Sequence, residues 1–125
     1  MLIVNSDSRD EQGYKVCDEA TQFAAFYIRP LTLRIEQELR EKAKQHDGSI
    51  DHDMYMQLEI DHIIKGWDLG DLGDEHGQAI EINTGNKISF ANKHFQIYMH
   101  LRKKAQEYQR LIEESLEQEK KDLEN

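Results

Sequence analysis

The sequence predicts a mainly α-helical domain with three principal helices and at most a small β element. Three observations favour this class. The 125-residue chain has one Pro and seven Gly, which argues against a loop-rich β-sandwich. Its hydrophobic fraction of 38% leaves little apolar surplus beside a charged fraction of 33%. Apolar residues also recur at helical spacing over long segments. We expect residues 1–125 to form a single domain.

The N-terminal part of the chain contains few residues that could build a core. Residues 1–13 are mostly polar apart from Leu2-Ile3-Val4, so we expect this segment to be mobile. Residues 23–28 mix aromatic and β-branched side chains with two alanines, which leaves strand and helix open; we favour an extended segment. Pro30 disfavours a helical backbone at Arg29 and predicts an element boundary there.

Two amphipathic helices are predicted in the middle of the chain. The first spans about residues 31–45, because apolar side chains recur every four residues from Leu31 to Ala43 and Gly48 follows. The second spans about residues 51–67, with Asp51 as its N-cap. Its apolar residues share one face; they are Met56, Ile60, Ile63, Ile64 and Trp67.

A glycine-rich acidic loop follows the second helix. Between Asp51 and Glu81 nine acidic residues stand against one basic residue, Lys65. This charge opposes contact with a phosphate backbone, so we do not expect nucleic acid as a partner. The run from Ile80 to Ile82 alternates like a short strand. We assign structural roles to residues around this loop, with Trp67 attaching it to the core and Gly77 making its turn: Ile63, Ile64, Trp67, Asp68, Gly77 and Ile80.

The third predicted helix spans about residues 89–121, with Ser89 or Asn92 as its cap. Such a helix is roughly 50 Å long, whereas a compact domain of this size is about 36 Å across. We therefore expect the helix to project beyond the domain and to need a partner along its apolar face. The alternative is a helix that bends after Tyr108 and packs within the chain. We expect residues 117–125 to fray.

Apolar residues on the second and third helices are the candidates for a partner or oligomer interface. They are Met54, Tyr55, Leu58, Tyr98, Leu101, Tyr108, Leu111, Ile112 and Leu116. For Tyr98 and Tyr108 a place in the core is the simpler interpretation.

No motif for catalysis, a cofactor or a metal emerges from the sequence. An EF-hand that began at Asp68 would have Gly70 at its third position and Ala79 at its twelfth, where calcium needs oxygen ligands. The histidines lack the spacing of a metal site, and Cys17 has no second cysteine. We expect no enzyme activity. The sequence also shows no apolar run long enough for a membrane span and no signal peptide, so we expect a cytoplasmic protein.

One stretch has the order of a known family signature. Paired aliphatic residues are followed by Trp-Asp, an acidic glycine-containing loop, a hydrophobic residue and a helix; these are Ile63-Ile64, Trp67-Asp68, residues 71–77, Ile80 and the helix after Ser89. The segment from Asp61 to Phe90 thereby resembles the centre of the tail assembly chaperones of long-tailed bacteriophages and prophages. Residues 29–32, Arg-Pro-Leu-Thr, are similar to the N-terminal portion of that family.

The resemblance implies a small, non-catalytic and largely helical protein. Such chaperones self-associate, coat the tape-measure protein during tail morphogenesis, recruit tail-tube subunits and are absent from the finished virion. A longer form is often made by a ribosomal frameshift near the end of the reading frame, and residues 119–121, Glu-Lys-Lys, are compatible with A-rich codons there. Two other hypotheses stay open: a small helical adaptor that dimerises through its C-terminal helix, and an acidic DNA-mimic inhibitor.

Overall fold

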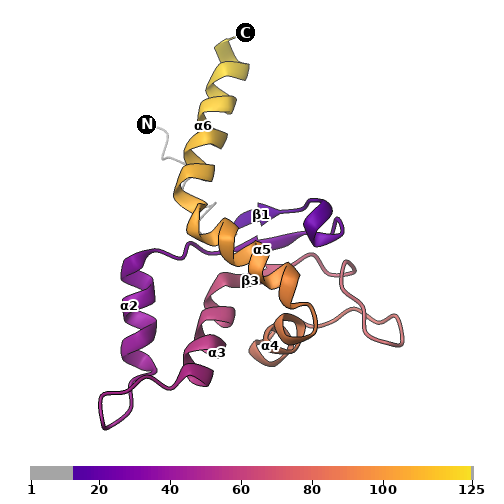
Figure 1. The fold of residues 1–125 in the computed structure, drawn as a ribbon. Helices are drawn as coiled ribbons and strands as arrows, with labels where there is room; N and C mark the ends of the chain where they lie inside the picture. Colours follow the sequence, from indigo (N-terminus) through magenta and orange to yellow (C-terminus); the bar gives the residue numbers. More distant parts are fainter. Residues whose placement is uncertain (1–12, 125) are drawn as a thin grey trace.

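A computed structural model describes residues 13–124, so the predicted mobile segment lies, up to residue 12, outside the described residues. Within that range five α-helices and one short 3-10 helix pack with a three-stranded antiparallel sheet (Figure 1). The prediction of a mainly α fold with a small β element is confirmed. In chain order the elements are β1 (Tyr14–Val16), η1 (Glu19–Thr21), β2 (Phe26–Ile28), α2 (Leu33–Lys42), α3 (His52–Ile63), β3 (Ile64–Trp67), α4 (Thr84–Lys93), α5 (Phe95–Gln106) and α6 (Tyr108–Glu124).

The sheet has β2 at its centre, with β1 and β3 antiparallel on either side. The extended conformation favoured for residues 23–28 is confirmed over Phe26–Ile28, where Phe26 and Ile28 are fully buried. Gly13 leads into β1 with φ of +85°, and a Cβ atom there would lie 2.7 Å from the carbonyl oxygen of Ile28. This close approach requires glycine.

Helices α2 and α3 begin at side-chain caps. The Thr32 hydroxyl accepts a hydrogen bond from the Ile35 amide at 3.3 Å, two residues after the boundary predicted at Pro30. The Asp51 carboxylate accepts from the Met54 amide at 3.1 Å, which confirms the predicted N-cap.

The second helix is shorter than predicted, because the chain passes from α3 directly into β3 at Ile64. Trp67 therefore lies on a strand, and the prediction of a helix over residues 51–67 is wrong at its end. β-branched Ile63 and Ile64 tolerate the extended conformation well, and pairing of β3 with β2 satisfies the backbone there. A Cβ atom on Gly66 would lie 3.1 Å from Ile82, so glycine also lets the returning chain pack closely.

The helix predicted over residues 89–121 is not confirmed, because three helices, α4, α5 and α6, cover this region. The first of them begins at Thr84, where the Asn83 side chain accepts from the Asn86 amide at 2.8 Å. Neither Ser89 nor Asn92 is a cap. Residues 80–82, which alternate like a strand in the sequence, are irregular in the structure.

The helices are separated at His94 and Glu107. The turn at His94 lets Phe90 pack against Phe26, with ring centroids 5.1 Å apart, while α5 packs elsewhere on the core. Backbone bonding nearly continues through Glu107, whose amide donates to Lys103 and whose carbonyl accepts from Leu111. From there α6 projects away from the body (Figure 1). Residues 117–124, which we expected to fray, are helical in this structure.

The core lies between the sheet and the helices α3 and α5. Its largest fully buried apolar side chains come from these elements; they are Phe26, Ile28, Ile60, Ile63, Ile64, Tyr98 and Leu101. None of the helices formed by residues 13–124 has the length and apolar character to cross a membrane.

Candidate interaction surfaces

Side-chain hydrogen bonds attach the acidic loop between β3 and α4 to the sheet and to Ala25, which precedes β2. The Trp67 indole N–H donates to the Ile80 carbonyl oxygen at 3.1 Å, across the loop. The Asp71 carboxylate accepts from the Ala25 amide at 2.8 Å, and Asp68 accepts from the Tyr27 hydroxyl at 2.9 Å. Trp67 stands at the start of the loop, and its buried indole holds Ile80, near the end of the loop, beside it.

Most carboxylates of this loop bind its own backbone or the adjacent strand. Asp74 accepts from the amides of His76 and Gln78 at 2.8 and 2.9 Å and so closes the tip, where Gly77 has φ of +76°. Among residues 13–124 no group of three or more His, Cys, Asp or Glu side chains has the arrangement of a metal site. The Asp74 carboxylate at the tip therefore stabilises the turn.

A groove of about 580 Å³ lies between this loop and α4. Its floor is apolar and consists of the half-buried side chains of Leu72, Ile80 and Phe90. The loop wall carries Glu75 and Glu81 as exposed acids. The α4 wall presents one helical face; it consists of Asn86, Ser89, Lys93 and the adjoining His94. The sequence did not predict this groove, because its two walls come together only when the loop folds back onto α4.

Helix α6 carries the second candidate surface. Leu111 and Ile112 are half-buried at its base, whereas Leu116 is 43% exposed and Leu123 is 88% exposed. Three of these residues, Ile112, Leu116 and Leu123, recur at intervals of four and seven and share one face. The apolar face therefore continues beyond the body of the molecule.

Several residues predicted for the interface belong to the core instead. Tyr98, Leu101 and Tyr108 are at most 3% exposed, so within one chain they are covered by other elements and form no contact surface. The sequence could not separate them from Leu116, because helical spacing groups side chains by face and does not show what covers the face.

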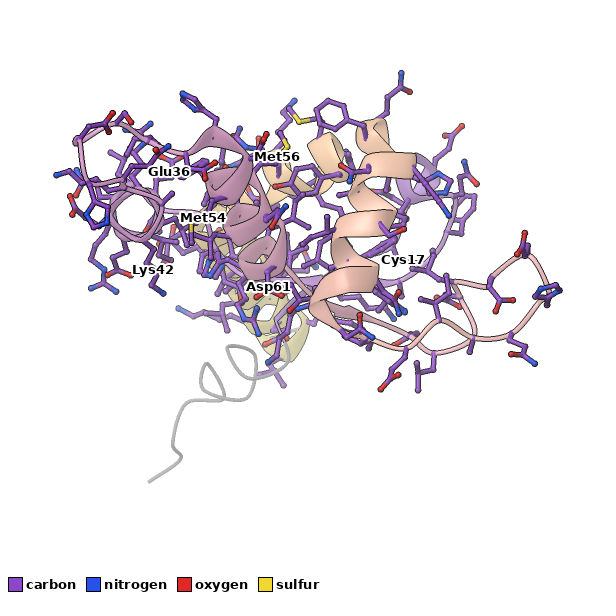
Figure 2. All side chains as sticks on the ribbon, turned by 90° about the horizontal axis from the view of Figure 1, so that it is seen from below. Cys17, Glu36, Lys42, Met54, Met56 and Asp61 are labelled. Carbon is purple, nitrogen blue, oxygen red and sulfur yellow. The ribbon has the colours of Figure 1, made fainter. Side chains whose placement is uncertain are left out.

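On α3 one residue predicted for the interface is exposed, and two are half-buried against the core. Met54 is 45% exposed, and Met56, which was assigned only to the apolar face, is 44% exposed; Figure 2 shows both on this helix. Tyr55 and Leu58 are half-buried and pack against the core. The four therefore do not form one surface.

The remaining residues assigned to structural roles lie around the base of the loop. Ile63, Ile64 and Trp67 are buried, and Ile80 is half-buried under the loop. Asp68 and Gly77 are exposed, with Asp68 held by Tyr27 as described above.

A buried ionic network, which the sequence analysis missed, joins three helices. Glu59 on α3 is 5% exposed and accepts hydrogen bonds from the Tyr98 hydroxyl at 2.7 Å and the Arg102 Nε at 2.8 Å. Arg102 also lies 3.7 Å from Glu36 on α2. Burial and the hydrogen bond to Glu59 raise the pKa of Tyr98, which therefore stays a neutral donor. The sequence contained one indication of this network: Glu59 stands four residues before Ile63 and so shares the apolar face of the helix.

A second polar cluster fixes α4 on α3. The Asp61 carboxylate accepts from the Thr84 hydroxyl at 2.8 Å and from the buried Lys87 ammonium at 3.3 Å; Figure 2 shows Asp61 on α3. Burial alone would raise the pKa of Asp61, but the Thr84 hydrogen bond and the Lys87 charge outweigh it, and this pKa is lowered. Both clusters have all their partners within the chain, so they are structural and leave the groove and α6 as the candidate interaction surfaces.

Comparisons of the chain with family models, with curated proteins and with solved structures find no match.

Proposed function

We propose that the chain is a non-catalytic tail assembly chaperone of a long-tailed bacteriophage or prophage. In this function it self-associates in the cytoplasm of the bacterial host and binds the tape-measure protein and tail-tube subunits during tail morphogenesis. The single observation that carries the proposal is α6, which projects from the body with Leu116 and Leu123 exposed. The resemblance of residues 61–90 to the family supplies the identity of the partners.

The projecting helix favours a binding protein for a physical reason. An α-helix of this length is marginal by itself in water and gains its stability from packing of an apolar face. Leu111, Ile112 and Ser115 are half-buried at the base of α6, whereas Leu116 and Leu123, further along the helix, are exposed among the described residues. A long helical partner that lies along this face would cover Leu116 and Leu123 in the manner of a coiled coil.

The test is co-expression of the chain with the tape-measure protein. Under this proposal a tape-measure gene lies immediately downstream in the source DNA, and its product co-purifies with the chain. Leu116→Asp places a charge on the exposed apolar face and should abolish co-purification, whereas Gln118→Asp adds the same charge to the other side of α6 and should preserve it. Equal capture by both variants, or the lack of a tape-measure gene, would overturn the proposal.

One observation favours the second candidate, an adaptor that dimerises through α6. The spacing of Ile112, Leu116 and Leu123 also fits the seam of a two-stranded coiled coil. Multi-angle light scattering across concentration separates the two. A discrete dimer supports the adaptor, and a series of larger species supports the chaperone.

A further inference from the structure

We infer that the chain self-associates head to tail, with the distal half of α6 from one copy seated in the groove between the acidic loop and α4 of the next copy. The inference rests on the proposed function, in which the protein self-associates, and assigns the two surfaces that do so. The occupant is a second copy of this chain, which competes with the tape-measure protein for the same leucines of α6.

The apolar parts of the two surfaces fit each other. Leu116 and Leu123 lie seven residues apart on one face of α6, about 10 Å along its axis. The groove offers an apolar floor of Leu72, Ile80 and Phe90 within its volume of about 580 Å³. Two leucine side chains of a helix are the kind of anchor that such a groove accepts.

Charged residues border both surfaces. The apolar face of α6 has Lys120 on one side and Glu119 on the other, and the groove has acids on its loop wall and Lys93 on its α4 wall. Lys120 follows Leu116 by four residues and precedes Leu123 by three, so it borders the apolar face of α6. The loop wall of the groove carries Glu75 and Glu81, neither of which is used to cap the loop as Asp74 is. With the leucines on the groove floor, Lys120 reaches this acidic wall.

The geometry excludes docking of α6 into the groove of its own chain. Figure 1 shows α6 leaving the body at the top while the loop and α4 lie at the lower right, and Figure 2, from below, shows α6 behind the body and the loop to the side. A contact between two different surfaces repeats from copy to copy and produces a ring or an open filament, unlike a two-fold pair of α6 helices.

A mixing experiment tests the inference. Leu123→Asp removes an anchor of the helix and keeps the groove, whereas Ser89→Trp fills the groove and keeps the helix. Each variant alone should be monomeric by light scattering, and an equimolar mixture should form a one-to-one pair, because one copy still offers a groove and the other a helix. Gln37→Trp, at an exposed position of α2, is the control and should associate like the wild type.

A charge exchange tests the same contact independently. Lys120→Glu and Glu81→Lys should each weaken self-association about fivefold, and the double variant should recover most of the loss. Ser89→Trp that associates like the wild type, or a mixture that stays monomeric, would overturn the inference. If Ser89→Trp associates normally and the tape-measure protein still co-purifies, the inference fails while the proposed function stands.

Discussion

At the scale of single residues, Glu59 shows how a charged side chain comes to lie in a core. Its carboxylate is 5% exposed and accepts hydrogen bonds from the Tyr98 hydroxyl and the Arg102 guanidinium. Burial opposes the charge on Arg102, but the hydrogen bond to Glu59 outweighs this and raises the pKa of Arg102. Glu59 and Arg102 therefore each stabilise the charge of the other in the core.

Removal of this carboxylate should destabilise the protein strongly. We expect Glu59→Ala to lower the free energy of unfolding by about 2 to 3 kcal/mol, because it leaves the Arg102 charge and the Tyr98 hydroxyl without their acceptor. The control is Glu38→Ala, which removes an exposed ion pair with Arg34 and should cost under about 0.5 kcal/mol. Urea unfolding measures the loss in free energy of unfolding for each variant. Equal losses would contradict a stabilising role for the buried network.

Asp61 leads to a prediction about pH. Its pKa is lowered in the folded chain by Thr84 and Lys87 despite burial, so its ionised form stabilises the fold. This contribution is present above about pH 4, the unfolded value, and is lost as the pH falls through the lower folded value. We therefore expect the gap in free energy of unfolding between the wild type and Asp61→Asn to shrink below about pH 4.

Urea unfolding at a series of pH values measures this gap. Asp53→Asn, on the exposed side of the same helix, controls for the change in net charge. A gap for Asp61→Asn that stays constant from pH 7 to pH 3 would show that the carboxylate contributes nothing by its charge.

At the scale of elements, the cap of α4 differs from the predicted one, since it is Asn83 and not Ser89 or Asn92. The Asn83 side chain accepts the hydrogen bond from the Asn86 amide, whereas Ser89 lies on an exposed face inside the helix. We expect Asn83→Ala to cost about 1 kcal/mol and Ser89→Ala to cost nothing. Thermal unfolding compares the two variants, and a larger loss for Ser89→Ala would contradict the cap.

At the scale of the whole molecule, α6 has separate parts for folding and for contact. Tyr108 is buried in the core, whereas Leu116 and Leu123 extend beyond it. We expect a chain that ends after Ser115 to keep its free energy of unfolding within about 0.5 kcal/mol, because the two deleted leucines are exposed among the described residues. Fluorescence of Trp67, the single tryptophan, follows unfolding from inside the core.

The same truncated chain should remain monomeric at concentrations where the full chain associates. Light scattering measures this, with the full chain in the same buffer as the control. A large loss of stability would instead show that the end of α6 packs on the body.

Local chemistry was enough to predict several features from the sequence. Pro30 and Asp51 limit the backbone nearby by ring geometry and by a side-chain hydrogen bond, and both predicted boundaries lie where the structure has them within two residues. The burial of Trp67 and the mainly helical class follow from apolar content and periodicity, which depend on the chain itself.

Other features depend on contacts between distant segments. Ile64 begins a strand because β2 offers its edge, and the predicted long helix is interrupted at His94, where the turn lets Phe90 pack against Phe26. The groove exists only where the loop returns to α4. The sequence by itself determined which side chains are apolar and that Asp51 caps a helix. Only the tertiary structure decided which apolar faces are covered, because burial is a property of the partners that a fold brings together.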